Sequence, residues 1–296
     1  MARDFVQLVD DLSYAKTYYP TSRVTKYINS LASRIYLSIY QNRREESNRL
    51  VRFWKYDVPL TIGKHHRIIL FSASLFILFY LLGFFSAKLD EGFTREVLGN
   101  SYVDMTEKNI AEGNPFGVYQ SGNSFLSWLG IMVNNVIFSI ISFVRGIVLG
   151  ILSITALIRT AMEVGVFHFM FAAKGLGVDF IFAVMLHGLL ELTAIVITCA
   201  AGVIMGTSYL FPGTMRRLQA FQVGVKDGVK IVIGLIPVFG IAAFFEGFIT
   251  GLYKMPRVLN IFLLTLSALF IIWYFIIYPI SLKKRFKEET LSLADA

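Results

Sequence analysis

The stretch from Asp179 to Gly206 constrains this chain most, because it is apolar over a membrane-spanning length and yet carries ionisable residues at its centre. A transmembrane helix needs about 20 mostly apolar residues. His187 and Glu191 stand one helical turn apart in this run, so both side chains project from one face. Ionisable groups in hydrocarbon are costly and normally face a bundle interior or a water-filled cavity. The stretch therefore predicts a buried membrane helix whose polar face needs partners from other helices.

The composition places the whole chain in the same class. Hydrophobic residues make up 55% of the 296 positions and charged residues only 16%, against about 45–50% and about 25% in soluble domains. Long apolar runs without alternation argue against a β-barrel. The formal net charge of +8 is explained by basic residues flanking membrane segments, so we expect no nucleic-acid partner. These features predict an all-α membrane protein that lies in a lipid bilayer as a polytopic helical bundle.

Apolar runs predict about six spans. The third is short, and is expected either to be buried as a short span or to be re-entrant. The expected spans are Ile68–Ser86, Val133–Ile158, Thr160–Ala173, Asp179–Gly206, Ile231–Gly251 and Val258–Ile280. The predicted organisation is a helical N-terminal region (1–67), a transmembrane bundle (68–287) containing an extracytoplasmic loop (87–124), and a tail (288–296).

The distribution of charge predicts the orientation. Residues 1–67 contain 12 Lys or Arg against 6 Asp or Glu, whereas residues 87–124 contain 6 acids against 3 bases. Basic residues concentrate on the cytoplasmic side of a membrane. We therefore expect a multi-pass protein of the cytoplasmic (inner) membrane with both termini in the cytoplasm.

Five ionisable residues within the expected spans form a predicted intramembrane polar cluster. Their predicted depths allow several to meet, because the fourth and fifth helices run in opposite directions and place His187, Glu191 and Glu246 in or near the outer half of the membrane. Arg145, expected near mid-depth of the second span, either extends its charge to an interface or, as its central position favours, pairs with a carboxylate, for which Glu191 is one candidate. The cluster consists of Arg145, Glu163, His187, Glu191 and Glu246.

The residues do not favour an enzyme. A zinc protease helix carries two histidines four residues apart with a glutamate between them, whereas His187-Gly-Leu-Leu-Glu191 has one histidine. The chain contains neither a G-x-S-x-G elbow nor a phosphate-binding P-loop motif. The single cysteine, Cys199, excludes a disulfide within the chain and a cysteine-based metal site. We therefore expect no catalytic residues, no metal and no cofactor.

Two functions remain open from the residues alone. Intramembrane glutamates often mark ion or proton pathways, which favours a small-solute transporter or permease using Glu191 and Glu246. The chain has no clear inverted repeat of the kind found in many transporters. Alternatively, the polar groups hold the helices together, and the N-terminal region and external loop assemble other membrane or envelope proteins. Self-association into a homo-oligomer also stays open.

Short motifs at matching places in the spans resemble those of the stage II sporulation protein M family. The motifs are Asn134-Asn135, His187-Gly188-Leu-Leu-Glu191-Leu192 and Glu246-Gly247. The resemblance covers roughly Phe53 to Lys287 and implies an integral protein of the cytoplasmic membrane. In endospore formers it implies a membrane anchor for two partner proteins that degrade peptidoglycan during engulfment. For this chain we carry over the membrane scaffold, and the motif residues without an assigned chemistry.

Overall fold

The computed structural model describes residues 2–41, 49–117, 124–249 and 255–294. Residues 118–123 of the expected external loop and the last two residues of the expected tail lie outside the described part. The described residues form helices and no strand. The chain divides into two compact units, Met1–Arg52 and Phe53–Ala296.

The first unit is built around two helices that pack against each other, α1 (Ala2–Tyr18) and α2 (Arg23–Gln41), followed by the short α3 (Arg49–Arg52). Ser22 caps α2, because its hydroxyl accepts a hydrogen bond of 3.0 Å from the backbone N–H of Thr25. The buried Thr25 hydroxyl in turn donates to the carbonyl of Tyr19 at 2.6 Å, which ties α2 to the end of α1. The sequence prediction of a helical N-terminal region therefore agrees with the structure.

The second unit contains six helices long and apolar enough to cross a membrane, as the sequence predicts. Several spans combine more than one labelled element. The spans are α5 (His66–Leu89); α8 (Ser124–Val144) with η3 (Arg145–Ile147); α9 (Ile151–Ala173); α10 (Gly177–Leu210); α11 (Arg217–Phe244) with η4 (Phe245–Ile249); and α12 (Arg257–Ile271) with η6 (Ile272–Ile277) and the start of α13 (Tyr278–Ala294). The prediction of an all-α polytopic bundle is confirmed.

The boundary between the second and third spans differs from the expected one. The turn lies at Val148–Gly150, where Leu149 and Gly150 have φ of 53° and 82°. Glycine adopts such a positive φ without steric cost, which allows the chain to reverse there. Arg159, which separates the second and third spans expected from the sequence, consequently lies inside α9. The third span, α9, has 23 residues, which is long enough to cross a membrane. The expectation of a short third segment is therefore wrong.

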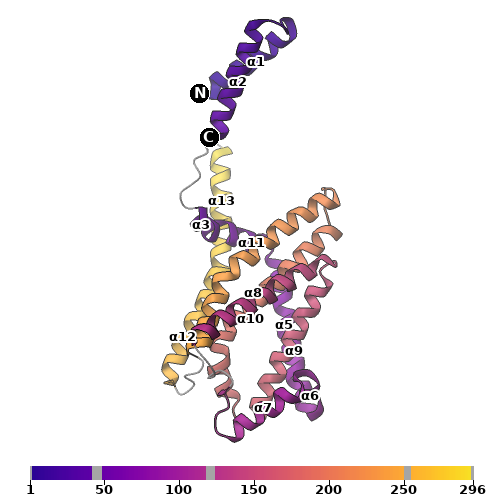
Figure 1. Cartoon of the computed structure of the whole chain (residues 1–296), viewed down its shortest axis with the longest axis vertical. Helices are drawn as coiled ribbons and strands as arrows, with labels where there is room; N and C mark the ends of the chain where they lie inside the picture. The colour runs from indigo at the N-terminus through magenta and orange to yellow at the C-terminus, as the bar shows by residue number, and fades with distance from the viewer. Residues whose placement is uncertain (1, 42–48, 118–123, 250–254, 295–296) are drawn as a thin grey trace. The chain divides into compact units, whose positions relative to one another are not determined.

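Helix α10 lies at the centre of the bundle and contacts α5, α8, α9, α11 and α12 (Figure 1). Small residues allow the close approach. A Cβ atom on Gly146 would collide with the backbone of Gly202, and one on Gly206 would collide with the backbone at Gly150. Close helix contacts in membranes commonly use such small residues. Gly146 and Gly150, before and at the end of the turn after η3, therefore pack directly on α10.

The bundle begins before the first span. Elements η1 (Phe53–Asp57) and α4 (Val58–Lys64) pack against α11 and the last span. The indole N–H of Trp54 donates to the carbonyl of Gly234 at 3.1 Å, and the Tyr274 hydroxyl donates to the carbonyl of Trp54 at 2.8 Å. Val58 is fully buried. Residues 53–67, which hydropathy assigns to the N-terminal region, are therefore part of the compact bundle.

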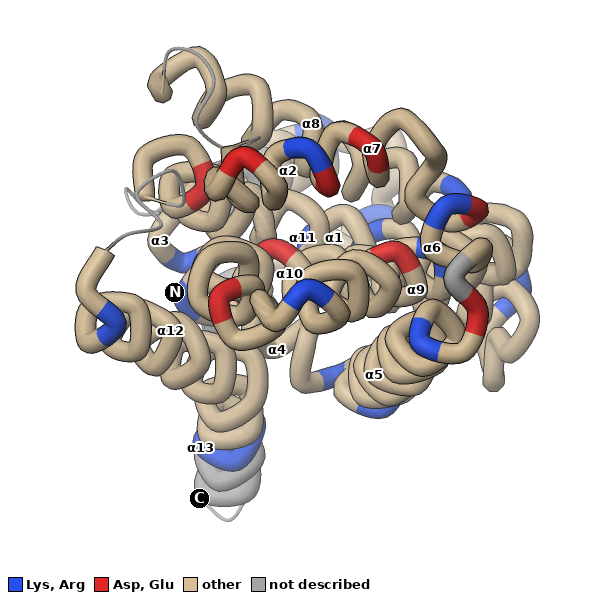
Figure 2. The backbone as a smooth tube through the Cα atoms, turned by 90° about the horizontal axis from the view of Figure 1, so that it is seen from below, with Lys and Arg blue, Asp and Glu red and all other residues tan. Residues whose placement is uncertain are grey.

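The segment between the first two spans forms α6 (Glu91–Leu98) and α7 (Asn100–Ala111), which lie beside the end of α9 (Figure 1). Figure 2 shows acidic and basic positions on both helices. Arg95 pairs with Asp104 at 2.6 Å and with Glu107 at 3.2 Å, and the Asp104 hydrogen bond raises the pKa of Arg95. Glu107 also lies 3.5 Å from Lys174 at the end of α9. This ion-pair network joins α6 and α7 to the bundle.

Candidate functional site

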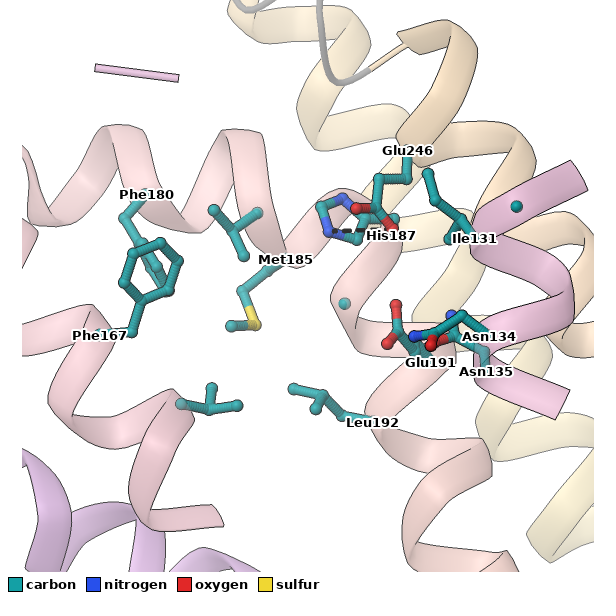
Figure 3. Close-up of a pocket in the computed structure, with 14 residues that line it drawn as sticks. Ile131, Asn134, Asn135, Phe167, Phe180, Met185, His187, Glu191, Leu192 and Glu246 are labelled. Carbon is teal, nitrogen blue, oxygen red and sulfur yellow. Dashed lines mark ion pairs between the residues drawn. The ribbon is translucent and has the colours of Figure 1, made fainter. Parts of the chain in front are cut away.

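A cavity of about 460 Å³ lies among α8, α9, α10 and η4 (Figure 3). One side is apolar and the other carries the polar groups that the sequence singles out. The lining residues are Gly130, Ile131, Asn134, Asn135, Val164, Phe167, Phe180, Val184, Met185, His187, Gly188, Glu191, Leu192 and Glu246. Asn134, one of these lining residues, is exposed.

Three ionisable side chains meet at the polar side. A ring nitrogen of His187 and one carboxylate oxygen from each of Glu191 and Glu246 all lie within 4.8 Å of one another. His187 Nε2 is 4.0 Å from Glu246 Oε2, and both side chains are largely buried (Figure 3). The structure therefore brings together the three residues whose predicted depths coincide.

Local helix geometry positions these groups. His187 and Glu191 are four residues apart on α10, so they project from one face. Glu246 belongs to η4, a five-residue π-helix that follows α11. Short π-helical segments interrupt α-helices frequently at functional sites. The π-helix changes the angular spacing of the side chains at the end of this span, and the carboxyl group of Glu246 lies beside His187 (Figure 3).

Asn135 adds a buried amide to the same wall. Its side chain is close to the carboxyl group of Glu191 (Figure 3), and the residue is 7% exposed. Its Nδ2 atom has no hydrogen-bond partner among the described residues. Buried polar atoms are nearly always hydrogen-bonded, and the neighbouring Glu191 carboxyl group is the acceptor to which this amide can donate.

The other predicted cluster members lie elsewhere. Arg145 is exposed in η3 at the end of the second span, because the chain turns three residues later, so it is not at mid-depth and does not line the cavity. Glu163 pairs with Arg159 on α9, N–O distance 2.8 Å, at a largely exposed site. The prediction of one cluster containing all five residues is therefore corrected to His187, Glu191 and Glu246.

The motif residues surround the site. Asn134, Asn135 and Gly188 line the cavity. Gly247 lies against α8, where an added Cβ would be 3.1 Å from the backbone nitrogen of Trp128. The indole N–H of Trp128 donates to the carbonyl of Gly240 at 3.0 Å and fastens α8 to α11 beside the site.

Helix α7 contacts the cavity wall from outside the spans. The rings of Tyr102 and Phe167, a cavity residue, are 5.6 Å apart. Burial raises the pKa of the Tyr102 hydroxyl, and the carboxylate of Glu246 raises it further. Phe116 is 1% exposed and stacks on Phe171 at 5.2 Å. The segment between the first two spans thus packs directly on the helices that form the site.

A second polar centre was not predicted from the sequence. Asp227 of α11 is 8% exposed, and its Oδ2 atom lies 2.6 Å from Lys64 Nζ and 2.9 Å from His65 Nε2. One sequence feature points to a buried position here: Asp227 shares a helical face with the small residues Gly224 and Gly228. Without a tertiary contact, Lys64 and His65 look like ordinary basic residues before a membrane span.

The fold and the cavity define a polytopic helical membrane protein with a polar site inside the bundle. A family model described as stage II sporulation protein M matches residues 72–251, and the chain belongs to this family. A second family model, described as a domain of unknown function (DUF8413), matches residues 1–41. No curated protein and no solved structure matches the chain.

Proposed function

We propose that the protein is an integral membrane scaffold that assembles or anchors cell-envelope proteins. The observation that carries this proposal is the attachment of α6 and α7 to the bundle. A binding surface works best on a rigid support, because ordering a loose segment on association costs free energy. The ion pairs of Arg95 and Glu107 and the buried ring of Phe116 provide that support.

The N-terminal unit offers a second docking surface. Helices α1 and α2 expose the large aromatic side chains of Tyr14, Tyr18 and Tyr27. Exposed aromatic residues are enriched where proteins bind one another. Since α5 separates this unit from α6 and α7 along the chain, the two surfaces would lie on opposite sides of the membrane.

The proposed location is the cytoplasmic membrane, with both termini in the cytoplasm. Basic residues before α5 and in α13 support this orientation through the positive-inside rule. The segment with α6 and α7 would then face the cell envelope. The proposed role is not enzymatic and needs no cofactor.

Site-specific photocrosslinking in native membranes tests the scaffold. The probe replaces Met105, which is exposed on α7, and a matched probe replaces Leu81, which is exposed on α5 within the first span. We expect discrete envelope proteins at position 105 that also recover this chain in reciprocal capture, and none of them at position 81. Identical patterns at the two positions, or no protein crosslinks at position 105, would contradict the scaffold.

A second candidate function is an ion- or proton-coupled permease, which the cavity beside Glu191 and Glu246 favours. Reconstituted vesicles would then pass protons or a small solute. Glu191→Gln would abolish flux while the protein stays folded, and Glu163→Gln would not, because Glu163 lies outside the cavity. Absence of flux for the wild-type chain would leave the scaffold as the better account.

A further inference from the structure

Two ionised carboxylates at this site would leave its charge unbalanced inside the bundle. Two carboxyl groups, Glu191 and Glu246, face one imidazole, His187, in a region where ionised groups need compensation. The described lining residues include no lysine or arginine. A protonated His187 could balance only one of two ionised glutamates. A dication bound between all three side chains would balance both carboxylates while the imidazole stays neutral.

We propose that His187, Glu191 and Glu246 bind one divalent transition-metal cation of the Zn²⁺ class. The geometry supports this assignment. Zinc lies about 2.0–2.2 Å from nitrogen and oxygen ligands, so two ligands on one tetrahedral ion lie about 3.3–3.6 Å apart. His187 Nε2 and Glu246 Oε2 are already 4.0 Å apart, and the set of three fits within 4.8 Å. Binding would require the two carboxyl groups to rotate toward the ion and close the remaining gap.

The ligand types select the class of cation. Imidazole nitrogen suits zinc, iron and related transition metals, whereas magnesium and calcium prefer oxygen ligands alone. Cys199 does not line the cavity, which leaves the site without thiolate and disfavours copper(I). One nitrogen and two carboxylates therefore fit Zn²⁺, with Mn²⁺ and Fe²⁺ as chemically related occupants.

Asn135 is placed to orient one of the proposed ligands. Its side chain is more than nine-tenths buried in the cavity wall, and its Nδ2 atom has no partner among the described residues. Metal-bound carboxylates are commonly oriented by hydrogen bonds from neighbouring groups. The Asn135 side chain lies beside Glu191 (Figure 3), and in the proposed complex its amide would donate to the Glu191 carboxylate and hold it toward the ion. Asn135 is therefore a positioning residue and not a ligand.

The cavity accounts for access and for the remaining coordination positions. Three protein ligands leave at least one position of a tetrahedral ion for water. The cavity of about 460 Å³ is large enough for such a water, and one of its lining residues, Asn134, is exposed. The proposal does not depend on the scaffold function, since a metal could bind here whether or not α7 captures partners.

The test uses the purified protein in detergent. The affinity tag contains no histidine, so that the tag itself does not bind zinc. After dialysis against a chelator, Zn²⁺ is added in a competition titration, and bound metal is counted by mass spectrometry. We expect about one tightly bound ion per chain. Affinity should fall at least about 100-fold in His187→Ala, Glu191→Gln and Glu246→Gln, and about 10–100-fold in Asn135→Ala. Glu163→Gln is the matched control and should bind like the wild type.

X-ray absorption of the wild-type zinc complex keeps the proposal falsifiable if a variant does not fold. The expected spectrum has a nitrogen and oxygen shell near about 2.0–2.1 Å with the outer-shell signal of one imidazole. Wild-type protein that binds no Zn²⁺ and no Mn²⁺ overturns the proposal. It is also overturned by folded variants that bind as tightly as the wild type, or by a spectrum without imidazole.

Discussion

His187 on α10 and Glu246 on η4 approach within 4.0 Å, although they belong to different spans. Consecutive spans run in opposite directions, so positions before the middle of α10 lie level with positions near the end of α11. The pair therefore depends on the antiparallel packing of these helices. Changes that separate α10 from α11 should disrupt the site before they disrupt the rest of the bundle.

Glu191→Gln should lower the stability of the folded protein. The carboxyl group lies between His187, Glu246 and the unsatisfied amide of Asn135, and an amide in its place cannot compensate the same partners. We expect a loss of about 1–3 kcal/mol in the free energy of unfolding. The thermal midpoint in detergent measures it, with Glu163→Gln as the control on an exposed pair. Equal midpoints for both variants would show that Glu191 has no structural role.

Asp227→Asn should destabilise the protein more than Asp104→Asn. Asp227 is buried and contacts both Lys64 and His65, so its loss leaves two donors at the junction of α4 and α5 without their acceptor charge. We expect a cost of about 1–3 kcal/mol. Asp104 pairs with Arg95 at an exposed site, where such a pair contributes about 0–1 kcal/mol. Chemical denaturation compares the two, and a larger effect at Asp104 would refute the ranking.

Gly202→Ala should impair folding, whereas Gly130→Ala should not. A Cβ at position 202 would lie 2.9 Å from Ser153 Cβ and 3.1 Å from the carbonyl oxygen of Phe143, so the helices must separate. Overpacking of this kind costs about 1–3 kcal/mol. A Cβ at position 130 meets no heavy atom within 4 Å. Size-exclusion profiles and thermal midpoints report the difference, and the account of helix packing fails if Gly202→Ala is as stable as the wild type.

Phe116→Ala should loosen α7 without unfolding the bundle. The ring is buried against Phe171, and Phe→Ala at a buried position costs about 3–5 kcal/mol of local packing. Hydrogen exchange should become faster in α7 and remain slow in α10. Met105→Ala is the control, since Met105 lies on α7 itself and is 41% exposed. Unchanged exchange in α7 would mean that the ion pairs alone hold this segment.

Much of the architecture can be predicted from sequence because long apolar runs have few alternatives in a membrane. The number of spans follows from their lengths. The helical spacing of His187 and Glu191 predicts their common face. The small residues at Gly146 and Gly150 predict a close helix contact, and the structure places them against α10.

The failures have a physical cause. The run Phe125–Ile158 is apolar throughout, so hydropathy cannot locate a turn that depends on the positive φ of Leu149 and Gly150. Because hydropathy predicts the turn too late in the chain, it places Arg145 near the middle of the membrane, whereas Arg145 lies at the end of the second span. The contacts of Trp54 with α11, and of His65 with Asp227, join positions far apart in the chain, and no local pattern encodes them.

The central position of α10 also sets an order for the making of the protein. Spans α5, α8 and α9 precede α10 in the chain, and all three pack against it. Until α10 is synthesised and inserted, buried polar groups such as Asn135 and Ser142 have no helix to cover them. Glu246 follows only with α11. Helices α5 and α9 can already pack against each other before α10 is made, but the polar site closes only late in biogenesis.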